Sequence, residues 1–320
     1  MEEAITILQK YSKCEQLLML YDHQTSNIQE ASLTPEETFD NLYHYIQEES
    51  IIENPHDFLF FLRLLRNIAI NHNNGNNFNE KLSHLMIKLK PILDKLENTE
   101  IIEEYEFIIK YSSENQNNNQ EINEDEQRLI DLIKKDSVGE FMRFIDDCDF
   151  SIDATIDFSK YDKRIKSDNY SIISYCAFLG SIQLFRYFLL NKASVDPVQI
   201  CYCAIYGQNY EILHSLEDNS YLTIDQPFYI SLIKAAIKMH HNEIANYLIE
   251  KKSGFDNCNS KELLFESLEY CNCPFITQLL PKYVNDLNDI FSHFGSDEYY
   301  HIVEKLLLIP TIDINHTDAI

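Results

Sequence analysis

The chain has 320 residues, of which 45% are hydrophobic and 12% aromatic, which is enough for a large buried core and argues against a disordered protein. Acidic residues outnumber basic ones by 52 to 26, and residues 1–124 and 125–320 each carry a net charge of −13. This balance disfavours nucleic acid and anionic membrane surfaces as partners, because both require Lys and Arg side chains that neutralise phosphate groups.

Several further classes of protein are disfavoured by composition. The chain has only 6 glycines, and they are far apart, so it has no glycine-rich phosphate-binding loop. Its longest apolar run, residues 58–70, is interrupted by Arg63 and Arg66 and is too short to span a bilayer. The first ten residues are acidic and lack the order of a signal peptide. Together with 8 scattered cysteines, these features predict a cytoplasmic protein, with the nucleus as the alternative compartment.

Residues 1–112 show helical spacing of apolar side chains throughout. Thr34 can cap a helix whose first residue is Pro35, and the Asn-rich stretch 71–77 predicts a loop. The region is therefore predicted to be all-helical, either as a bundle or as a run of helical hairpins. The expected helices are Glu2 to Tyr21, Pro35 through Ile46, Asn54 through Ile68, Glu80 to Leu96 with an interruption at Pro91, and about Glu100 to Tyr111.

Residues 113–125 form a polar stretch rich in Asn and Glu. Such a composition cannot bury enough apolar surface to offset the entropy of ordering. We expect a linker here, between a helical region at 1–112 and a second region at 126–320.

Residues 126–320 contain a unit that recurs about every 30 residues. In each copy, a small or apolar residue lies seven positions before a pair of residues that begins the apolar stripe of a second helix. These residues are Cys176, Ala204 and Ala236 in the clear copies, Ser267 and Phe294 in weaker ones, and Ile133 in a degenerate first copy. An insertion follows the first copy, at about residues 148–166. Because a helical pair this short cannot bury its apolar face alone, the pattern predicts a stack of about five or six helical pairs, with an incomplete last pair.

The best-preserved copy is DNYSIISYCAFLG at residues 168–180, with Gly180 in the expected turn. It resembles a divergent ankyrin repeat, with Ser171 in place of the usual Thr and Ile173 in place of the Leu. Residues 252–256 and 310–315 are similar to the segment that opens an ankyrin finger. More closely, residues 171–252 resemble a family of unknown function found beside ankyrin repeats in protist proteins, in which an Asn-rich helical region precedes the repeats. No complete Thr-Pro-Leu-His motif is present.

The resemblance implies a non-enzymatic scaffold that binds other proteins through a concave helix face and finger loops. The acidic chain would prefer partners with basic surfaces. The predicted contact residues are loop aromatics and acids: Tyr161, Asp196, Tyr221, Asp225, Phe255 and Asp256. The competing interpretation is that these residues only hold the fingers together. The oligomeric state has no signal in the sequence.

Catalytic and metal-binding roles find little support in the motifs. Cys201 and Cys203 are two apart and point to different sides if helical, and Cys271-x-Cys273 lacks the spacing of a zinc knuckle. His240-His241 falls in an expected turn, where a structural role is favoured. We therefore predict no catalytic residue, no metal and no cofactor, with an enzyme whose active site lies in the N-terminal helical region as the alternative function.

Overall fold

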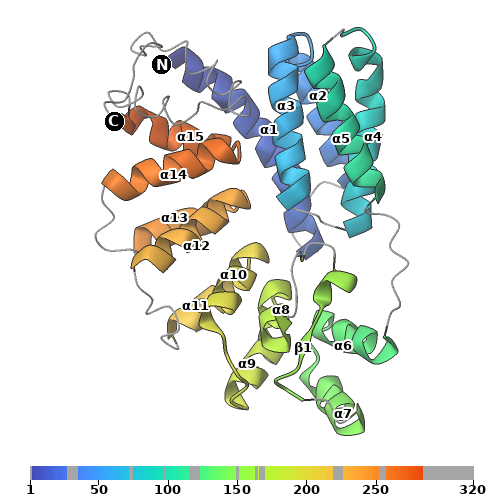
Figure 1. The fold of residues 1–320 in the computed structure, drawn as a ribbon, viewed down its shortest axis with the longest axis vertical. Coiled ribbons are helices and arrows are strands. Elements are labelled where there is room, and N and C mark those ends of the chain that lie inside the picture. Colours follow the sequence, from blue (N-terminus) through green and yellow to red (C-terminus); the bar gives the residue numbers. More distant parts are fainter. Residues whose placement is uncertain are drawn as a thin grey trace. The chain divides into compact units, whose positions relative to one another are not determined.

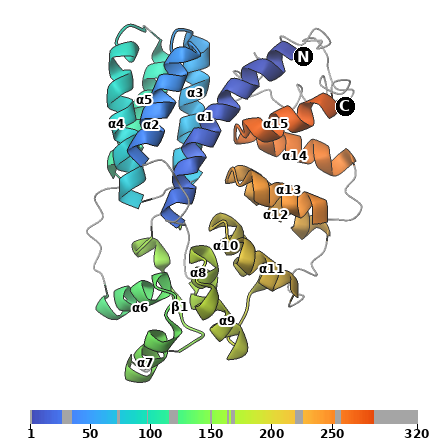
Figure 2. The same ribbon diagram turned by 180° about the vertical axis from the view of Figure 1, so that it is seen from behind.

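A computed structural model describes residues 2–26, 35–71, 75–96, 98–114, 123–148, 151–162, 165, 170–218, 226–251 and 257–283. These residues form fifteen α-helices, two short 3-10 helices and one pair of two-residue strands (Figures 1 and 2), which confirms the all-α class. Contacts divide the chain into two compact units. Unit 1 comprises residues 1–117 and 254–320, and unit 2 comprises residues 118–253. None of the described helices combines the length and the apolarity needed to cross a membrane.

Unit 1 is built from the N-terminal helices and the last described helical pair. Within it, α1 packs on α2 and α15, while α3 and α4 both pack on α5. The elements are α1 (Glu2–Ser26), α2 (Pro35–Glu48), α3 (Pro55–Asn71), α4 (Gly75–Leu93), α5 (Thr99–Glu114), α14 (Asn257–Glu269), α15 (Cys273–Leu279) and the 3-10 helix η2 (Leu280–Tyr283).

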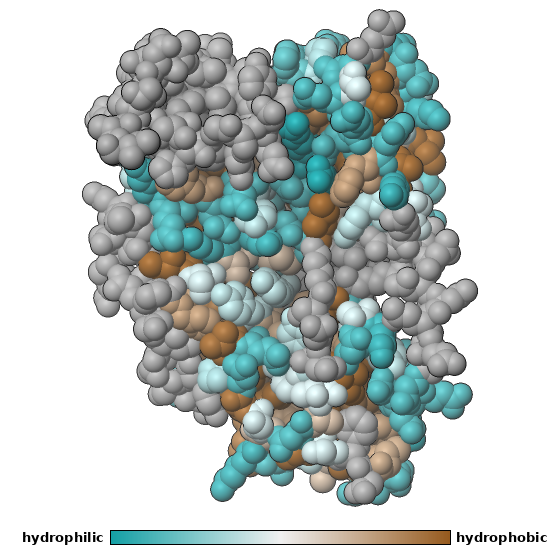
Figure 3. All heavy atoms as spheres, in the orientation of Figure 1, coloured by the Kyte–Doolittle hydropathy of each residue, from teal (hydrophilic) through white to brown (hydrophobic). Residues whose placement is uncertain are grey.

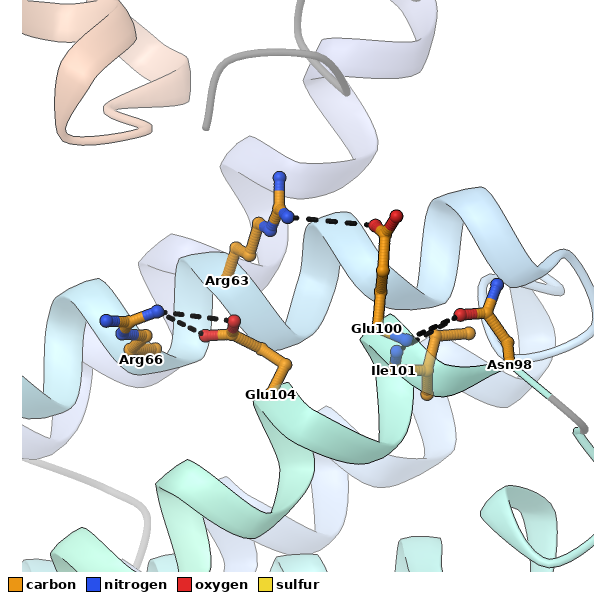
Figure 4. A network of polar contacts seen from close by, with 6 residues as sticks. All are labelled: Arg63, Arg66, Asn98, Glu100, Ile101 and Glu104. Carbon is orange, nitrogen blue, oxygen red and sulfur yellow. Dashed lines mark hydrogen bonds and ion pairs between the residues drawn. The ribbon is translucent and has the colours of Figure 1, made fainter. Parts of the chain in front are cut away.

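Local signals account for most of these boundaries. The Asn98 side chain accepts hydrogen bonds from the first amides of α5 (Figure 4), and Asn54 caps α3 in the same way. The predicted loop at 71–77 is wrong for Asn71, which still belongs to α3, and for its last three residues, because α4 already begins at Gly75. Asn residues are tolerated there since the first amides of a helix need no partner within it. Pro91 lies in the last turn of α4 and does not end the helix.

Helix α3 supplies much of the core of unit 1. Ten of its 17 residues are buried, and its two arginines lie on the side that faces α5. There Arg66 binds both carboxylate oxygens of Glu104, at 3.2 and 3.3 Å, and Arg63 lies 3.9 Å from Glu100 (Figure 4). The positive charges that interrupt the apolar run of α3 are therefore neutralised by its neighbour.

The grouping of α14 and α15 with the N-terminal helices differs from the predicted division, which placed all of residues 126–320 in one region. Helix α15 packs on α1, where the carboxylate of Glu15, with only 1% of its surface exposed, accepts a 3.0 Å hydrogen bond from the Cys273 amide. This contact joins residues 258 positions apart, so no local pattern could indicate it.

Unit 2 consists of helical hairpins in chain order. The first helices α6, α8, α10 and α12 pack in series, and so do the second helices α7, α9 and α11. The pairs are α6 (Glu124–Lys134) with α7 (Val138–Cys148), α8 (Ile172–Leu179) with α9 (Ile182–Leu190), α10 (Pro197–Tyr206) with α11 (Tyr210–Asp218), and α12 (Gln226–Lys238) with α13 (Asn242–Lys251). Residues 115–122 of the predicted linker lie outside the described residues, and α6 begins within its last residues, capped by Asn123.

The insertion before α8 contains the strands. Strand β1 (Thr155–Ile156) pairs antiparallel with β2 (Tyr170–Ser171), and the 3-10 helix η1 (Phe158–Lys160) lies between them in the chain. The buried Phe158 ring stacks on Tyr175 of α8 at 3.9 Å between centroids. The insertion therefore contributes to the core of unit 2.

The hairpin turns of unit 2 share one backbone geometry. The turn residues have positive φ: Asp136 (51°), Gly180 (75°), Gln208 (57°) and His240 (53°). The amide of the next residue then bonds back to the carbonyl five positions earlier, as in a Schellman motif. The acceptors are Cys176 at 3.0 Å, Ala204 at 2.8 Å and Ala236 at 2.9 Å, the small residues of the predicted repeat.

The first copy differs from the prediction by one position. There the acceptor is Leu132 rather than Ile133, at 3.5 Å from the amide of Ser137. Both residues are buried and apolar, and the small residue that marks the other copies is missing, so spacing alone could not choose between them.

Candidate protein-binding surface

The connection between α9 and α10, residues 191–196, is held in place at both ends, and we call it the α9–α10 finger. The Ala193 amide bonds to the Phe188 carbonyl at 3.0 Å, and the Ser194 amide donates to Asp153 of the insertion at 2.6 Å. At its far end Asp196 caps α10, accepting from the amides of Val198 and Gln199 at 3.0 and 3.2 Å. The finger is thus a preformed loop, as binding loops on rigid scaffolds commonly are.

Two exposed apolar side chains flank this finger. Leu190 at the end of α9 has 83% of its surface exposed, and Val198 at the start of α10 has 46%. Leu190 follows the buried Phe188 by two residues, which is about 200° around the helix. Its side chain therefore points away from the buried face of α9. Neither residue is among the contact residues predicted from the sequence. The signal available for Leu190 is its position on the helix, outside the stripe of buried apolar residues.

Of the predicted contact residues, Asp196 lies in the finger itself. Both of its capping bonds use Oδ1, and the side chain remains exposed. It therefore has a structural role and still places a negative charge beside Val198.

Tyr161 has a structural role in the insertion. Its hydroxyl donates to the carboxylate of Glu126 and accepts a 3.3 Å bond from the Asn123 amide, at the start of α6. Burial and the bond to this carboxylate raise the pKa of Tyr161. The hydrogen bonds of Tyr161 are to residues at the start of α6, and those of Asp196 are to residues of α10. The two predicted contact residues are therefore held by different hairpins. Tyr221, Asp225, Phe255 and Asp256 lie outside the described residues.

The side of unit 2 formed by the first helices carries aromatic side chains, and we call it the first-helix face. The half-buried Tyr202 ring lies 5.9 Å from both Tyr206 on α10 and Phe228 on α12. Its hydroxyl donates to Ser231 at 3.0 Å, which links α10 to α12. Aromatic rings of this kind are frequent anchors at protein interfaces.

The second helices have a different surface, because several of their polar and charged side chains are paired with one another. Arg186 of α9 binds Glu211 of α11 at 2.9 Å, and Tyr247 of α13 donates to Glu217 of α11 at 2.6 Å. These pairs link neighbouring hairpins and use up side chains that could otherwise bind a partner. The first-helix face and the finger are therefore the better candidates for a contact surface.

The buried cysteines among the described residues are poorly suited to nucleophilic chemistry. Burial raises the pKa of the Cys201 and Cys271 thiols to about 12, and it also raises the pKa of Cys14, Cys203 and Cys273. A thiol with a raised pKa is not ionised at neutral pH, and the thiolate is the form that attacks substrates and binds metals.

Metal binding finds no site in the part of the chain that the structure describes, where no group of three or more His, Cys, Asp or Glu side chains could hold an ion. His240 and His241 lie buried in the α12–α13 turn, and the His241 ring is 3.3 Å from the Tyr206 carbonyl. Comparisons of the chain with protein-family models, curated proteins and solved structures found no match.

Proposed function

We propose that the chain is a non-enzymatic scaffold that binds another protein through the α9–α10 finger and the first-helix face of unit 2. The observation that carries the proposal is Leu190, an 83% exposed leucine beside a loop held by hydrogen bonds at both ends. A rigid loop that presents an apolar side chain loses little entropy on binding.

An ankyrin-like stack is the architecture we propose for unit 2. Support comes from its helical pairs, from first helices packed in series and from a left-handed residue in every described hairpin turn of the unit. The short β1–β2 ladder before α8 is comparable to a finger. In such a stack the first helices and fingers form a concave surface suited to an extended partner.

Charge indicates the kind of partner. Residues 118–253 contain 21 acidic and 14 basic side chains, a net charge of −7. Asp196 adds a negative charge next to the exposed Val198. We therefore propose a partner with a basic surface and at least one apolar side chain that covers Leu190.

The test starts from the whole chain. Proximity labelling in the native cell identifies candidate partners, and each is then purified and titrated against the wild-type protein. Leu190→Asp should weaken a true complex at least about tenfold, because it places a charge in a desolvated contact. Met142→Asp is the matched control, since Met142 is an exposed apolar residue of α7 in the same unit. Equal affinity for all three proteins would refute the proposed surface.

A further inference from the structure

The outer face of α5 in unit 1 carries aromatic side chains that its own fold leaves partly uncovered. Phe107 has 38% of its surface exposed, and its ring runs nearly parallel to that of Tyr111, with 6.3 Å between centroids and 15° between planes. Glu103 and Glu106 lie on the same helix face, since residues three and four apart are neighbours on a helix. We call these four residues the α5 strip. Figure 3 shows brown, apolar side chains among teal ones over α4 and α5.

One edge of the strip already holds a guanidinium group. The Arg66 guanidinium lies 4.1 Å from the Phe107 centroid. It also binds both carboxylate oxygens of Glu104 (Figure 4). An arginine held between an aromatic face and a carboxylate combines a cation–π contact with charge-assisted hydrogen bonds. Side chains of α5 therefore already bind one basic side chain within the fold.

The two carboxylates of the strip, Glu103 and Glu106, are not paired with an arginine. Glu100 and Glu104 are paired with Arg63 and Arg66, whereas Glu103 and Glu106 are exposed and make no ion pair or hydrogen bond with the described residues. These two carboxylates and the exposed Lys110, four residues after Glu106, therefore lie beside the exposed Phe107 and leave the strip with a net negative charge.

The net charge of unit 1 favours a basic segment over a second copy of the chain as the ligand of the strip. The sequence of unit 1, residues 1–117 and 254–320, contains 31 acidic and 12 basic side chains, a net charge of −19. A second copy of the chain would meet like charge there, and like charges in contact are unfavourable. A basic segment would meet opposite charge and an aromatic surface.

We propose that the α5 strip binds a basic peptide segment of a partner protein. One Arg or Lys side chain of that segment lies against Phe107 and Tyr111, between Glu103 and Glu106. This surface is separate from the finger of unit 2, and the inference does not depend on the function proposed above.

The test is a titration of the full chain with a fluorescein-labelled peptide of alternating arginine and glycine, followed by fluorescence anisotropy. Glu103→Gln with Glu106→Gln should weaken binding at least about tenfold, because both charges that face the arginine are lost. The control is Glu48→Gln with Glu53→Gln, which removes the same charge from two exposed positions, one at the end of α2 and one in the connection to α3. The control should change affinity less than about twofold, since distant exposed charges are screened by salt. Circular dichroism verifies that each variant folds.

A second variant separates the aromatic contribution from the charge. Phe107→Leu keeps an apolar side chain but removes the ring, and should weaken binding by about two- to fivefold. Equal weakening by the two glutamine pairs, no effect of Phe107→Leu, or no binding of the arginine peptide by the wild-type chain would each overturn the proposal. Variants of the strip should leave any complex that depends on Leu190 unchanged, so this proposal and the proposed function can fail separately.

Discussion

The side-chain amide of Asn209 donates hydrogen bonds to the carbonyls of Ala177 and Phe178, at 2.8 and 3.0 Å, and so ties the α10–α11 turn to the helix of the preceding hairpin. Ser181 and His241 occupy the same position in their own turns. The Ser181 hydroxyl donates to the Ile133 carbonyl at 2.7 Å, and the His241 ring lies 3.3 Å from the Tyr206 carbonyl. Three different polar residues thus contact the last turn of the preceding first helix.

Replacing Asn209 tests how much this contact contributes to the stability of the protein. Asn209→Ala leaves two carbonyls at a packed junction without their donor, so the free energy of unfolding should fall by about 1–3 kcal/mol. Urea denaturation followed by circular dichroism measures the change. Glu250→Gln, at an exposed position on α13, is the control and should change stability by less than about 0.5 kcal/mol. Equal stability of the Asn209 variant and the wild type would show that the contact is not needed between hairpins.

Replacement by alanine should change the stability of the protein in opposite directions at two glycines of unit 2. A Cβ atom at Gly207 would lie 1.8 Å from the backbone carbonyl oxygen of Phe178, so Gly207→Ala should cost at least about 2 kcal/mol of stability. A Cβ atom at Gly139 in α7 would meet nothing within 4 Å, and Gly139→Ala should stabilise by about 0.5–1 kcal/mol through helix propensity. Thermal unfolding compares the two variants. A tolerated Gly207→Ala would mean that α8 and the α10–α11 turn are less closely packed than the structure shows.

Two substitutions of Asp196 separate its role as a helix cap from the effect of its charge. Asn is as good a cap as Asp, so Asp196→Asn should keep the stability of the protein, whereas Asp196→Ala should lose about 1 kcal/mol. Both variants should bind a basic partner more weakly than the wild type. Chemical denaturation and titration with an identified partner measure the two properties. If Asp196→Asn bound as well as the wild type, the residue would be a cap and nothing more.

The buried thiols predict a loss of stability at alkaline pH. Burial raises the pKa of Cys201 from 9.0 to about 12, so the unfolded chain releases this proton at a lower pH than the folded one. The contribution of Cys201 is complete below pH 9 and declines as the pH rises from about 9 to about 12, at about 1.4 kcal/mol per pH unit. Cys201→Ala should reduce the slope of stability against pH by this amount. Urea unfolding at pH 8 and above measures the slope, and an unchanged slope would contradict the assigned burial.

Local sequence signals determined much of the secondary structure. The apolar spacing at residues 1–112, Pro35, Pro55 and Pro197 at helix starts, and the left-handed Gly180 all express preferences of a few neighbouring residues. The recurring small residues at Cys176, Ala204 and Ala236 were visible for the same reason, because each lies at a fixed distance before its hairpin turn.

Tertiary structure alone decided which elements pack together and which side chains remain exposed. The pairing of α15 with α1 depends on Glu15 and Cys273, and the guanidinium site on α5 depends on Arg66 in α3. Spacing along the chain records the period of a helix, but burial depends on residues brought together from distant positions.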